Sequence, residues 1–365
     1  MDLSGIINKY KGKKVLVTGH TGFKGSWMCR VLINSGAIVT GYSLEPPTDP
    51  SIFELIGMAS QMDSVIGDIR DLKHLREVFD KAKPEIVIHM AAQPIVRTSY
   101  DDPVYTYETN VMGTVNVLEC VRLSDSVKSF VNVTTDKVYR NDERNEAFKE
   151  DDFLNGYDPY SNSKSCSELV TSCYRNSFFN KEDGSRVAIS TMRAGNVIGG
   201  GDFAKDRIIP DCVRAALAGE DIIVRNPHSI RPFQHVLEPV CAYLMLAMLQ
   251  YEDPSVSGSY NIGPNDADCL TTGELATAFC NEWNRVTGDS LKWIDRNDGG
   301  PHEAKYLKLN CDLIKNKFGW MPVWSAYDAV NKTIEWTIAM RKNDRAELLS
   351  CMDAQIKEYI SCGES

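Results

Sequence analysis

The sequence predicts an α/β protein built on a doubly wound parallel sheet, with a smaller α/β domain towards the C-terminus. Two observations carry this prediction. Short apolar runs alternate with longer amphipathic segments through the first half of the chain, which is typical of strand-helix-strand units around a parallel sheet covered on both faces. The chain of 365 residues also exceeds what one compact core usually holds, so a second, smaller domain is expected.

The expected strands of the sheet are short and rich in Val and Ile. They span residues 14–18, 37–41, 64–66, 86–89, 129–134 and 187–193. The helices expected between them span residues 22–35, 72–81, 104–123 and 161–177. Further along, the pattern predicts helices near 209–218 and over 237–249, and a strand over 259–262.

The regular alternation ends after Ala194. We therefore expect residues 1–195 to form the first domain, with 235–263 returning to it. Residues 196–234 and 264–365 are expected to form the second, substrate-binding domain.

The composition narrows the class of protein. A net charge of −10 and a pI near 5.2 disfavour non-specific binding to nucleic acid or anionic lipid, so an anionic substrate must meet a local positive cluster. No signal-length apolar segment precedes the first strand, and nowhere do about 18 apolar residues run together, which predicts a cytoplasmic protein without a membrane anchor. The 11 cysteines lack CxxC spacing and a disulfide framework, and no metal site is expected.

A glycine-rich turn follows the first expected strand. Gly19, Gly22 and Gly25 have the spacing GxxGxxG between a strand and an amphipathic helix, where a dinucleotide pyrophosphate binds the helix N-terminus. Gly19 suits the tight turn, Gly22 lets the phosphates approach, and Gly25 permits close packing of helix and strand. Lys24 could add a point charge. The turn predicts a Rossmann nucleotide-binding domain.

The choice of nicotinamide cofactor is less clear from the residues. The acid that should end the second strand is missing, because Glu45 comes a few residues too late. No Arg stands there for a 2′-phosphate either, so NAD is favoured over NADP. Asp68 follows the third strand and could accept a hydrogen bond from the adenine amino group, or could be a turn or capping aspartate.

Tyr160 and Lys164 form a YxxxK pair at the start of an expected helix, which puts both on one face. A Lys ammonium beside a phenol should lower the Tyr pKa, so that Tyr160 can move a proton while a nicotinamide moves a hydride. Thr135 follows the fifth strand at the sheet edge where such folds bind ligands, and its hydroxyl can anchor the substrate oxygen.

Together, the TGxxGxxG turn, Thr135 and YxxxK make the chain resemble the extended short-chain dehydrogenase/reductases over essentially its whole length. Within that family, an acid and a second group directly after the Thr are typical of nucleotide-sugar 4,6-dehydratases, and here they are Asp136 and Lys137. Oxidation of sugar carbon 4 acidifies the proton on carbon 5. A base must then remove that proton while an acid protonates the departing hydroxyl on carbon 6.

The second group is usually Glu in the dTDP- and GDP-sugar enzymes, whereas Lys137 resembles the CDP-glucose 4,6-dehydratases. Seven stretches resemble that group as well: TGHTGFKGSW, GYSLEPPT, HMAAQP, YDPYSNSK, RAGNVIGGGD, RPFQHVLEP and PHEAKYLKL. The implied substrate is CDP-glucose, although no residue spacing identifies a cytosine pocket. A nucleotide-sugar epimerase or reductase, or a dehydratase of another NDP-hexose, is the alternative enzyme, and a regulator that kept the fold without catalysis is the alternative from another class.

The resemblance implies three sets of site residues. The catalytic set is Thr135, Asp136, Lys137, Tyr160 and Lys164. The cofactor set is Gly19, His20, Gly22, Phe23, Lys24, Gly25, Asp68, Ile69, Ala91, Ala92, Gln93, Asn110, Tyr160 and Lys164, with Asn110 supporting Lys164 through ordered water. The substrate set is Gln93, Thr135, Asn196, Arg207, Arg225, Arg231 and His302.

Family members commonly form dimers through two helices from each subunit. Here the helix after Asp102 and the Tyr-bearing helix would supply them, which implies a homodimer or higher homo-oligomer. The expected apolar surface consists of Val111, Val115, Leu118, Leu169 and Tyr174.

Overall fold

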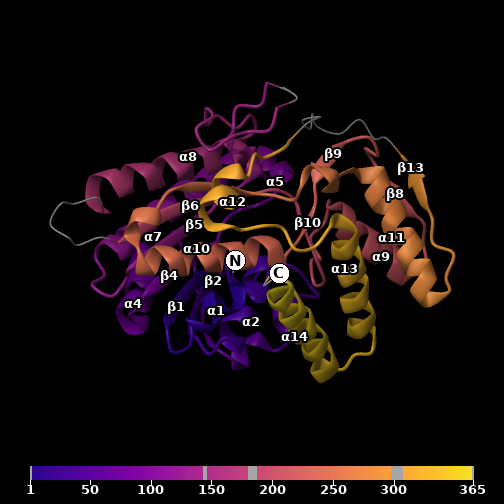
Figure 1. Cartoon of the computed structure of the whole chain (residues 1–365), viewed down its shortest axis with the longest axis horizontal. Coiled ribbons are helices and arrows are strands. Elements are labelled where there is room, and N and C mark those ends of the chain that lie inside the picture. Colours follow the sequence, from indigo (N-terminus) through magenta and orange to yellow (C-terminus); the bar gives the residue numbers. More distant parts are fainter. Residues whose placement is uncertain (1, 143–145, 180–186, 297–306, 364–365) are drawn as a thin grey trace.

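A computed structural model of the chain describes residues 2–142, 146–179, 187–296 and 307–363. Its centre is a sheet of seven parallel strands in the order β11-β6-β5-β4-β1-β2-β3 (Figure 1). The strands are β1 (Lys14–Thr18), β2 (Ile38–Ser43), β3 (Asp63–Ile66), β4 (Ile86–His89), β5 (Ser129–Val133), β6 (Ala188–Ala194) and β11 (Ser259–Ile262). The predicted doubly wound fold is confirmed, and the expected strand boundaries differ from these by at most two residues.

Alternate side chains along each strand enter two different cores, as the two-residue repeat of a strand requires. Val15 and Val17 pack with α2 (Phe23–Asn34) and α10 (Leu237–Glu252) on one face. Leu16 packs on the other face, against helices α4 (Leu72–Ala82) and α7 (Gly113–Arg122). Helix α8 (Pro159–Tyr174) contacts α7 on that second face. Both faces are therefore covered, which explains why the strands are apolar throughout.

The helix expected over residues 104–123 is divided into three parts. A short helix α6 (Pro103–Tyr107) passes into one turn of π-helix (Glu108–Met112) before α7 begins. Leu118, which was expected on a subunit surface, is fully buried in the core against α4, so that expectation is wrong. The inserted turn rotates the helix face that follows it, which a simple 3.6-residue repeat cannot predict.

A second core lies beside the sheet, on the right of Figure 1. Helices α9 (Ile208–Ala218), α11 (Thr272–Thr287) and α13 (Ala326–Arg341) surround it. Three two-stranded ladders join these segments. They pair β7 (Val197–Ile198) with β10 (Gln234–His235), β8 (Ile222–Val224) with β13 (Trp293–Asp295), and β9 (Ile230–Pro232) with β12 (Cys269–Thr271).

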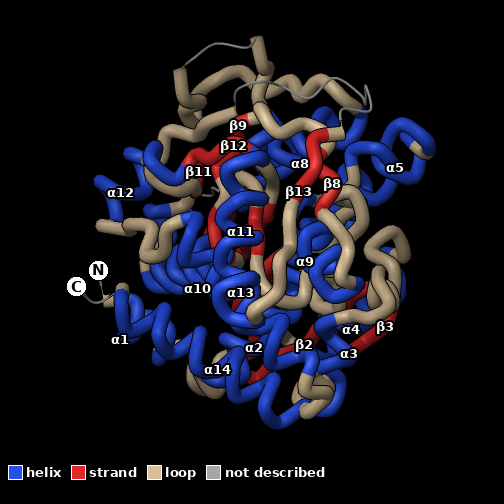
Figure 2. The backbone as a smooth tube through the Cα atoms, turned by 90° about the vertical axis from the view of Figure 1, so that its right-hand side faces the viewer, coloured by secondary structure: helices blue, strands red, loops and turns tan. Residues whose placement is uncertain are grey.

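The remaining elements are short or peripheral. The α-helices among them are α1 (Leu3–Asn8), α3 (Ile52–Leu55), α5 (Val96–Asp101), α12 (Asp312–Phe318) and α14 (Arg345–Cys362). The short 3-10 and π turns are Met58–Ser60, Asp136–Val138, Arg175–Phe179, Pro254–Val256 and Asp266–Asp268. Helices α1 and α14 lie side by side, which brings the two ends of the chain together (Figures 1 and 2). Within the described part of the chain, no helix combines the length and apolarity needed to cross a membrane.

Candidate active site

The glycine turn between β1 and α2 is shaped by close packing at two of its three glycines. Gly19 has φ of +80°, and a Cβ there would lie 2.8 Å from the backbone N of Ala91. A Cβ at Gly25 would lie 2.1 Å from the carbonyl O of Gly19, so only glycine fits. At Gly22 the nearest atom to a Cβ would be 3.5 Å away, which is ordinary contact.

Gly22 therefore serves a purpose other than internal packing. It is the N-cap residue of α2 and provides no side-chain hydrogen bond to the helix. The first N–H groups of this 12-residue helix are left for another acceptor, which is the usual arrangement at a phosphate-binding helix. These residues fit the pyrophosphate of a dinucleotide. Phe23 is the first residue of the helix and is partly buried.

The predicted cofactor residue His20 is buried and points towards β2 and β3. Its Nε2 lies 2.7 Å from Ser64 Oγ, and a Cβ at Gly41 would collide with its ring. Burial lowers the pKa of His20 to about 4, so the imidazole is neutral at physiological pH. Beside it, the hydroxyls of Thr21 and Ser43 lie 2.9 Å apart at the end of β2, where the ribose-binding acid is missing.

The carboxylate of Asp68 is held by its neighbour Arg70. It accepts hydrogen bonds from the Arg70 backbone N at 2.8 Å and from Nη2 at 2.7 Å. The turn interpretation of Asp68 therefore describes its present contacts, and its contact with adenine stays a prediction. The Ile69 side chain is only 4% exposed and packs against Gly113, at the start of α7.

The loop after β4 contains Ala91 and Ala92, which are both partly buried, and Gln93. The Gln93 side chain is 5% exposed and both its ends are used within the protein. Its Nε2 donates to Thr106 Oγ1 at 2.9 Å, and its Oε1 accepts from the Ile95 backbone N at 2.6 Å. These contacts show a structural role for the amide group.

Asn110 lies in the π-helical turn and fixes the same loop. Its Oδ1 accepts from the Gln93 backbone N at 2.8 Å, and its Nδ2 donates to the Gln93 carbonyl O at 3.0 Å and to Ser163 Oγ at 2.9 Å. Ser163 precedes Lys164 on α8. Asn110 thus links the Gln93 loop to the Tyr-bearing helix, and its support of Lys164 through water stays a prediction.

The end of β5 gathers three of the predicted catalytic groups. Thr135 donates to Asp136 Oδ1 at 2.9 Å, and Lys137 Nζ approaches the same oxygen at 2.9 Å. The Asp136 side chain is fully buried, whereas the Lys137 side chain is 30% exposed. Asn196, a predicted substrate ligand from the loop after β6, accepts from Lys137 Nζ at 3.4 Å.

Tyr160 and Lys164 face the same place from the first turns of α8. Asp158 caps this helix by accepting from the Ser161 backbone N at 2.9 Å, and Pro159 occupies its first turn. Lys164 Nζ donates to the Val133 carbonyl O at 3.1 Å. The helix start thus fixes both catalytic side chains relative to β5.

The expected lowering of the Tyr160 pKa is not what the structure gives. Burial raises the pKa of Tyr160 to about 12, although a hydrogen bond with Thr135 opposes the rise. The pKa of Lys164 is lowered to about 8 by burial and by the nearby Lys24. The sequence argument considered the attraction between ammonium and phenolate but not the cost of burying either charge.

Glu168, one turn beyond Lys164 on α8, forms a buried ion pair with Arg193 of β6. It accepts from Thr134 Oγ1 at 2.5 Å, from Thr191 Oγ1 at 2.6 Å and from Arg193 Nη2 at 2.8 Å. Arg193 also donates to the Tyr139 hydroxyl at 2.7 Å, just after the catalytic loop. Glu168 was not among the predicted site residues, although its spacing of four residues from Lys164 places it on the same helix face.

Two further cations enter the site from α9 and α2. Arg207 precedes α9, is 38% exposed and pairs with Asp202 at 3.0 Å. Lys24 is close enough to Arg207, Asp136 and Lys137 to be affected by their charges, and burial lowers its pKa to about 8. Lys24, predicted as a phosphate contact, therefore points towards the catalytic end. Asp202 lies in the quoted motif RAGNVIGGGD but was not singled out.

The other predicted substrate ligands are less closely associated with this cluster. Arg231 is 7% exposed in β9 and donates to the Ile230 carbonyl O at 2.9 Å. Arg225 pairs with Asp206 at 2.7 Å and with Asp211 at 3.3 Å. His302 lies outside the described residues.

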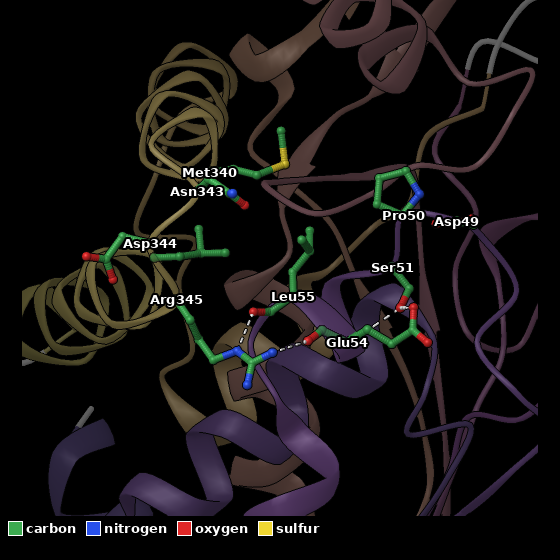
Figure 3. A pocket seen from close by; sticks show the side chains of 10 residues that line it. Asp49, Pro50, Ser51, Glu54, Leu55, Met340, Asn343, Asp344 and Arg345 are labelled. Carbon is green, nitrogen blue, oxygen red and sulfur yellow. Dashed lines mark hydrogen bonds between the residues drawn. The ribbon is translucent and has the colours of Figure 1, made fainter.

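Two surface cavities lie away from these groups. One of roughly 440 Å³ lies between α3 and the junction of α13 and α14, where Arg345 donates to the carbonyl oxygens of Glu54 and Leu55 (Figure 3). Another of roughly 660 Å³ lies between α11, α13 and α14. None of the predicted catalytic residues lines either cavity, so the candidate site rests on the side-chain cluster at the end of β5.

Comparisons with known proteins show the family to which the chain belongs. Residues 16–333 match the sequence model of the family described as GDP-mannose 4,6 dehydratase. A CDP-glucose 4,6-dehydratase of Salmonella typhimurium is 46% identical over 357 residues, which cover 97% of this chain and 98% of that enzyme. A dTDP-glucose 4,6-dehydratase of Haemophilus influenzae is 26% identical and covers 88% of this chain and 97% of that protein.

A solved structure shares the fold. The dTDP-glucose 4,6-dehydratase of Bacillus anthracis, in complex with NAD, has a TM-score of 0.72 and 22% identity, and the match covers 91% of this chain and 98% of that one. The matches at the level of sequence and fold both extend over nearly the entire chain. The chain therefore belongs to the GDP-mannose 4,6 dehydratase family of short-chain dehydrogenase/reductases.

Proposed function

We propose that this protein is an NAD-dependent CDP-glucose 4,6-dehydratase, which converts CDP-D-glucose to CDP-4-dehydro-6-deoxy-D-glucose and water. The observation that carries the proposal is the ion pair of Asp136 and Lys137 at the end of β5, beside Tyr160. An epimerase releases no water and needs neither group. The 46% identity to the Salmonella typhimurium CDP-glucose enzyme supports the choice of substrate.

NAD would supply the acceptor for the hydride that leaves sugar carbon 4 and would return it to carbon 6. The N-terminus of α2, open at Gly22, would hold the pyrophosphate. Lys164, on α8, would hold the nicotinamide ribose. The residues proposed to complete this site are those of the predicted cofactor set.

After Tyr160 has lost its own proton to solvent, its phenolate would accept the proton of the carbon 4 hydroxyl, and Thr135 would hold the same oxygen. Because burial raises the Tyr160 pKa to about 12, the phenolate needs stabilisation when it forms. Thr135 and Arg207 both lower that pKa, through a hydrogen bond and through charge. A sugar hydroxyl donating to the phenolate adds a further stabilising hydrogen bond.

The ion pair of Lys137 and Asp136 can supply both groups that elimination needs. Transfer of one proton across the 2.9 Å contact turns ammonium and carboxylate into a neutral amine and a carboxylic acid. The Lys137 amine then takes the carbon 5 proton, and Asp136 protonates the carbon 6 hydroxyl as its carbon–oxygen bond breaks. Both residues return to their charged forms, and one water leaves.

The two phosphates of the substrate need positive charge in this acidic protein. We place them near Arg207 and Arg231, with Asn196 beside Lys137 at the sugar end. Arg225 and His302 complete the proposed substrate set, and the segments 196–234 and 264–365 form the proposed substrate-binding domain.

The direct test is to incubate the purified protein and NAD with CDP-glucose, and separately with dTDP-, UDP- and GDP-hexoses, and to record product masses. A product lighter by one water from CDP-glucose alone is expected. Loss of water from another nucleotide sugar would keep the reaction but refute the CDP assignment. An unchanged mass with altered stereochemistry would make the protein an epimerase.

We also propose a homodimer through the α6–α7 segment and α8. Large apolar side chains are exposed on both: Val104 is 66% exposed, Met112 52% and Leu169 56%. Such side chains usually indicate a contact with another protein surface when they gather on neighbouring helices. Sedimentation velocity at micromolar protein should give a dimer, and a monomer at all concentrations would refute this proposal.

A further inference from the structure

The hydroxyl of Tyr243 is a buried polar group with no assigned role. Tyr243 lies on α10 and is 0% exposed. Within the part of the chain that the structure describes, its hydroxyl forms no hydrogen bond. Buried hydroxyls nearly always have a partner, so this one can bind an atom that the described residues do not supply.

Its surroundings place the Tyr243 side chain beside the catalytic cluster. Lys24 Nζ lies over the Tyr243 ring, 6.0 Å from its centroid. Burial holds the pKa of Tyr243 well above its ordinary value, and the nearby Tyr160 and Asp136 raise it further. The phenol therefore stays neutral and can act as a hydrogen-bond donor at any pH of interest.

Asp136 offers a second free position in the same place. Its Oδ1 is used by Thr135 and Lys137, but its Oδ2 is buried and forms no hydrogen bond to any described residue. Gly195 leaves space there, because a Cβ at this position would lie 3.3 Å from Oδ2. The Tyr243 hydroxyl and the Asp136 carboxyl group are thus two buried polar groups with hydrogen-bonding capacity left for a ligand oxygen.

We propose that Tyr243 is a catalytic residue of the elimination step, whose hydroxyl donates a hydrogen bond to the oxygen of sugar carbon 6 as it leaves. This inference rests on the proposed dehydratase function. The carbon 5 proton goes to the Lys137 amine, the carbon 6 oxygen takes its proton from the Asp136 carboxyl group, and Tyr243 keeps its own proton. The Lys24 ammonium over the ring makes the phenol a stronger donor.

The test compares Tyr243→Phe with Tyr10→Phe. The Tyr10 hydroxyl is also buried against α10, where it donates to the Leu244 carbonyl O at 2.7 Å, but Tyr10 follows α1 and lies outside the site. Single-turnover reactions would be run with CDP-glucose in deuterated buffer. Three quantities would be measured: the absorbance of reduced nicotinamide, the loss of water by mass, and the deuterium content at carbon 5 of recovered substrate. Binding of NAD would be measured separately by calorimetry.

In Tyr243→Phe we expect oxidation at the wild-type rate, but water loss slower by about tenfold to a hundredfold, as for loss of one donor to a developing charge. Reduced nicotinamide should accumulate, and recovered substrate should contain more deuterium at carbon 5 than with wild type. Tyr10→Phe should change none of these. A Tyr243→His variant, which keeps a ring N–H donor, should regain part of the elimination rate.

Three results would overturn the inference. These are unchanged water loss in Tyr243→Phe, an equal fall in oxidation and elimination, or a weaker affinity for NAD with the partition between the two steps unchanged. If Tyr243→Phe is poorly folded, the Tyr243→His variant is used instead. The inference would be overturned if Tyr243→His accumulated no more reduced nicotinamide, relative to the product it forms, than the wild-type protein does. Failure of the wild-type protein to release water from any nucleotide sugar would instead refute the proposed function.

Discussion

Replacing Glu168 by Gln should destabilise the protein far more than the small change in shape suggests. The wild-type carboxylate is 2% exposed and its partner Arg193 is 3% exposed. Gln removes the negative charge but leaves the guanidinium buried. A buried charge that loses its partner is costly because neither water nor another group compensates it.

The magnitude follows from the contacts that change. Arg193 loses a 2.8 Å charge-assisted bond, and the hydroxyls of Thr134 and Thr191 lose a charged acceptor at 2.5 and 2.6 Å. Breaking a buried pair of this kind typically costs about 3–5 kcal/mol in the free energy of unfolding. Removing both charges, in Glu168→Gln with Arg193→Met, should cost less than the single change, since no unpaired charge remains.

Urea unfolding followed by tryptophan fluorescence would measure both variants. Burial raises the pKa of Glu168, but Arg193 and the threonine hydroxyls lower it by more, so this pKa lies below its ordinary value. The stabilisation by this group is therefore present above the unfolded pKa of about 4.3 and is lost as pH falls through the lower folded value. A Glu168→Gln variant within about 1 kcal/mol of wild type at pH 7 would refute this account of the network.

Three further changes separate chemistry from structure. Lys137→Ala should still oxidise substrate transiently, seen as reduced nicotinamide, but should release no water; full turnover would place the base elsewhere. Lys164→Met should abolish activity yet raise the free energy of unfolding by roughly 1–3 kcal/mol at pH 7. The reason is that the pKa of Lys164 in the folded protein, about 8, lies below its ordinary value of 10.5, so the charged side chain destabilises the fold at pH 7. Urea unfolding at several pH values should show this difference vanish above pH 10.5. Gly22→Ala should keep the wild-type Tm but weaken NAD binding in calorimetry. Gly25→Ala should lower the Tm, because its Cβ would lie 2.1 Å from a backbone oxygen. Equal effects of the two changes would refute the different roles given to these glycines.

The central sheet could be predicted from the sequence because each of its strands has a recognisable local pattern. A buried parallel strand is a short run of apolar residues, and β1, β4 and β11 begin and end where the pattern does. The ladders of the second core were not predicted, since β7 and β10 contain two residues each and pair across a long stretch of chain. Their register is set by packing between distant segments, which leaves no periodic signal.

The candidate site divides in the same way. Thr135, Asp136 and Lys137 could be predicted to lie together with Tyr160 because strand ends and helix starts of a doubly wound sheet meet at one edge. Tyr243 carries no such signal. It is one position among the buried residues of α10, and only the packing of that helix brings it next to Lys24, Tyr160 and Asp136.

The charges at the site explain how an acidic protein can hold an anionic substrate. Lys24 and Lys164 are both buried, and their pKa values are lowered to about 8. Positive charge is unfavourable at both positions because burial and a neighbouring cation oppose it. A ligand carrying phosphate charge relieves that opposition, because it supplies the counter-charge that Asp136 and Asp202 give only in part. Binding should therefore raise the pKa of both lysines, and the ligand's stabilisation of the folded state should weaken as salt screens the same charges.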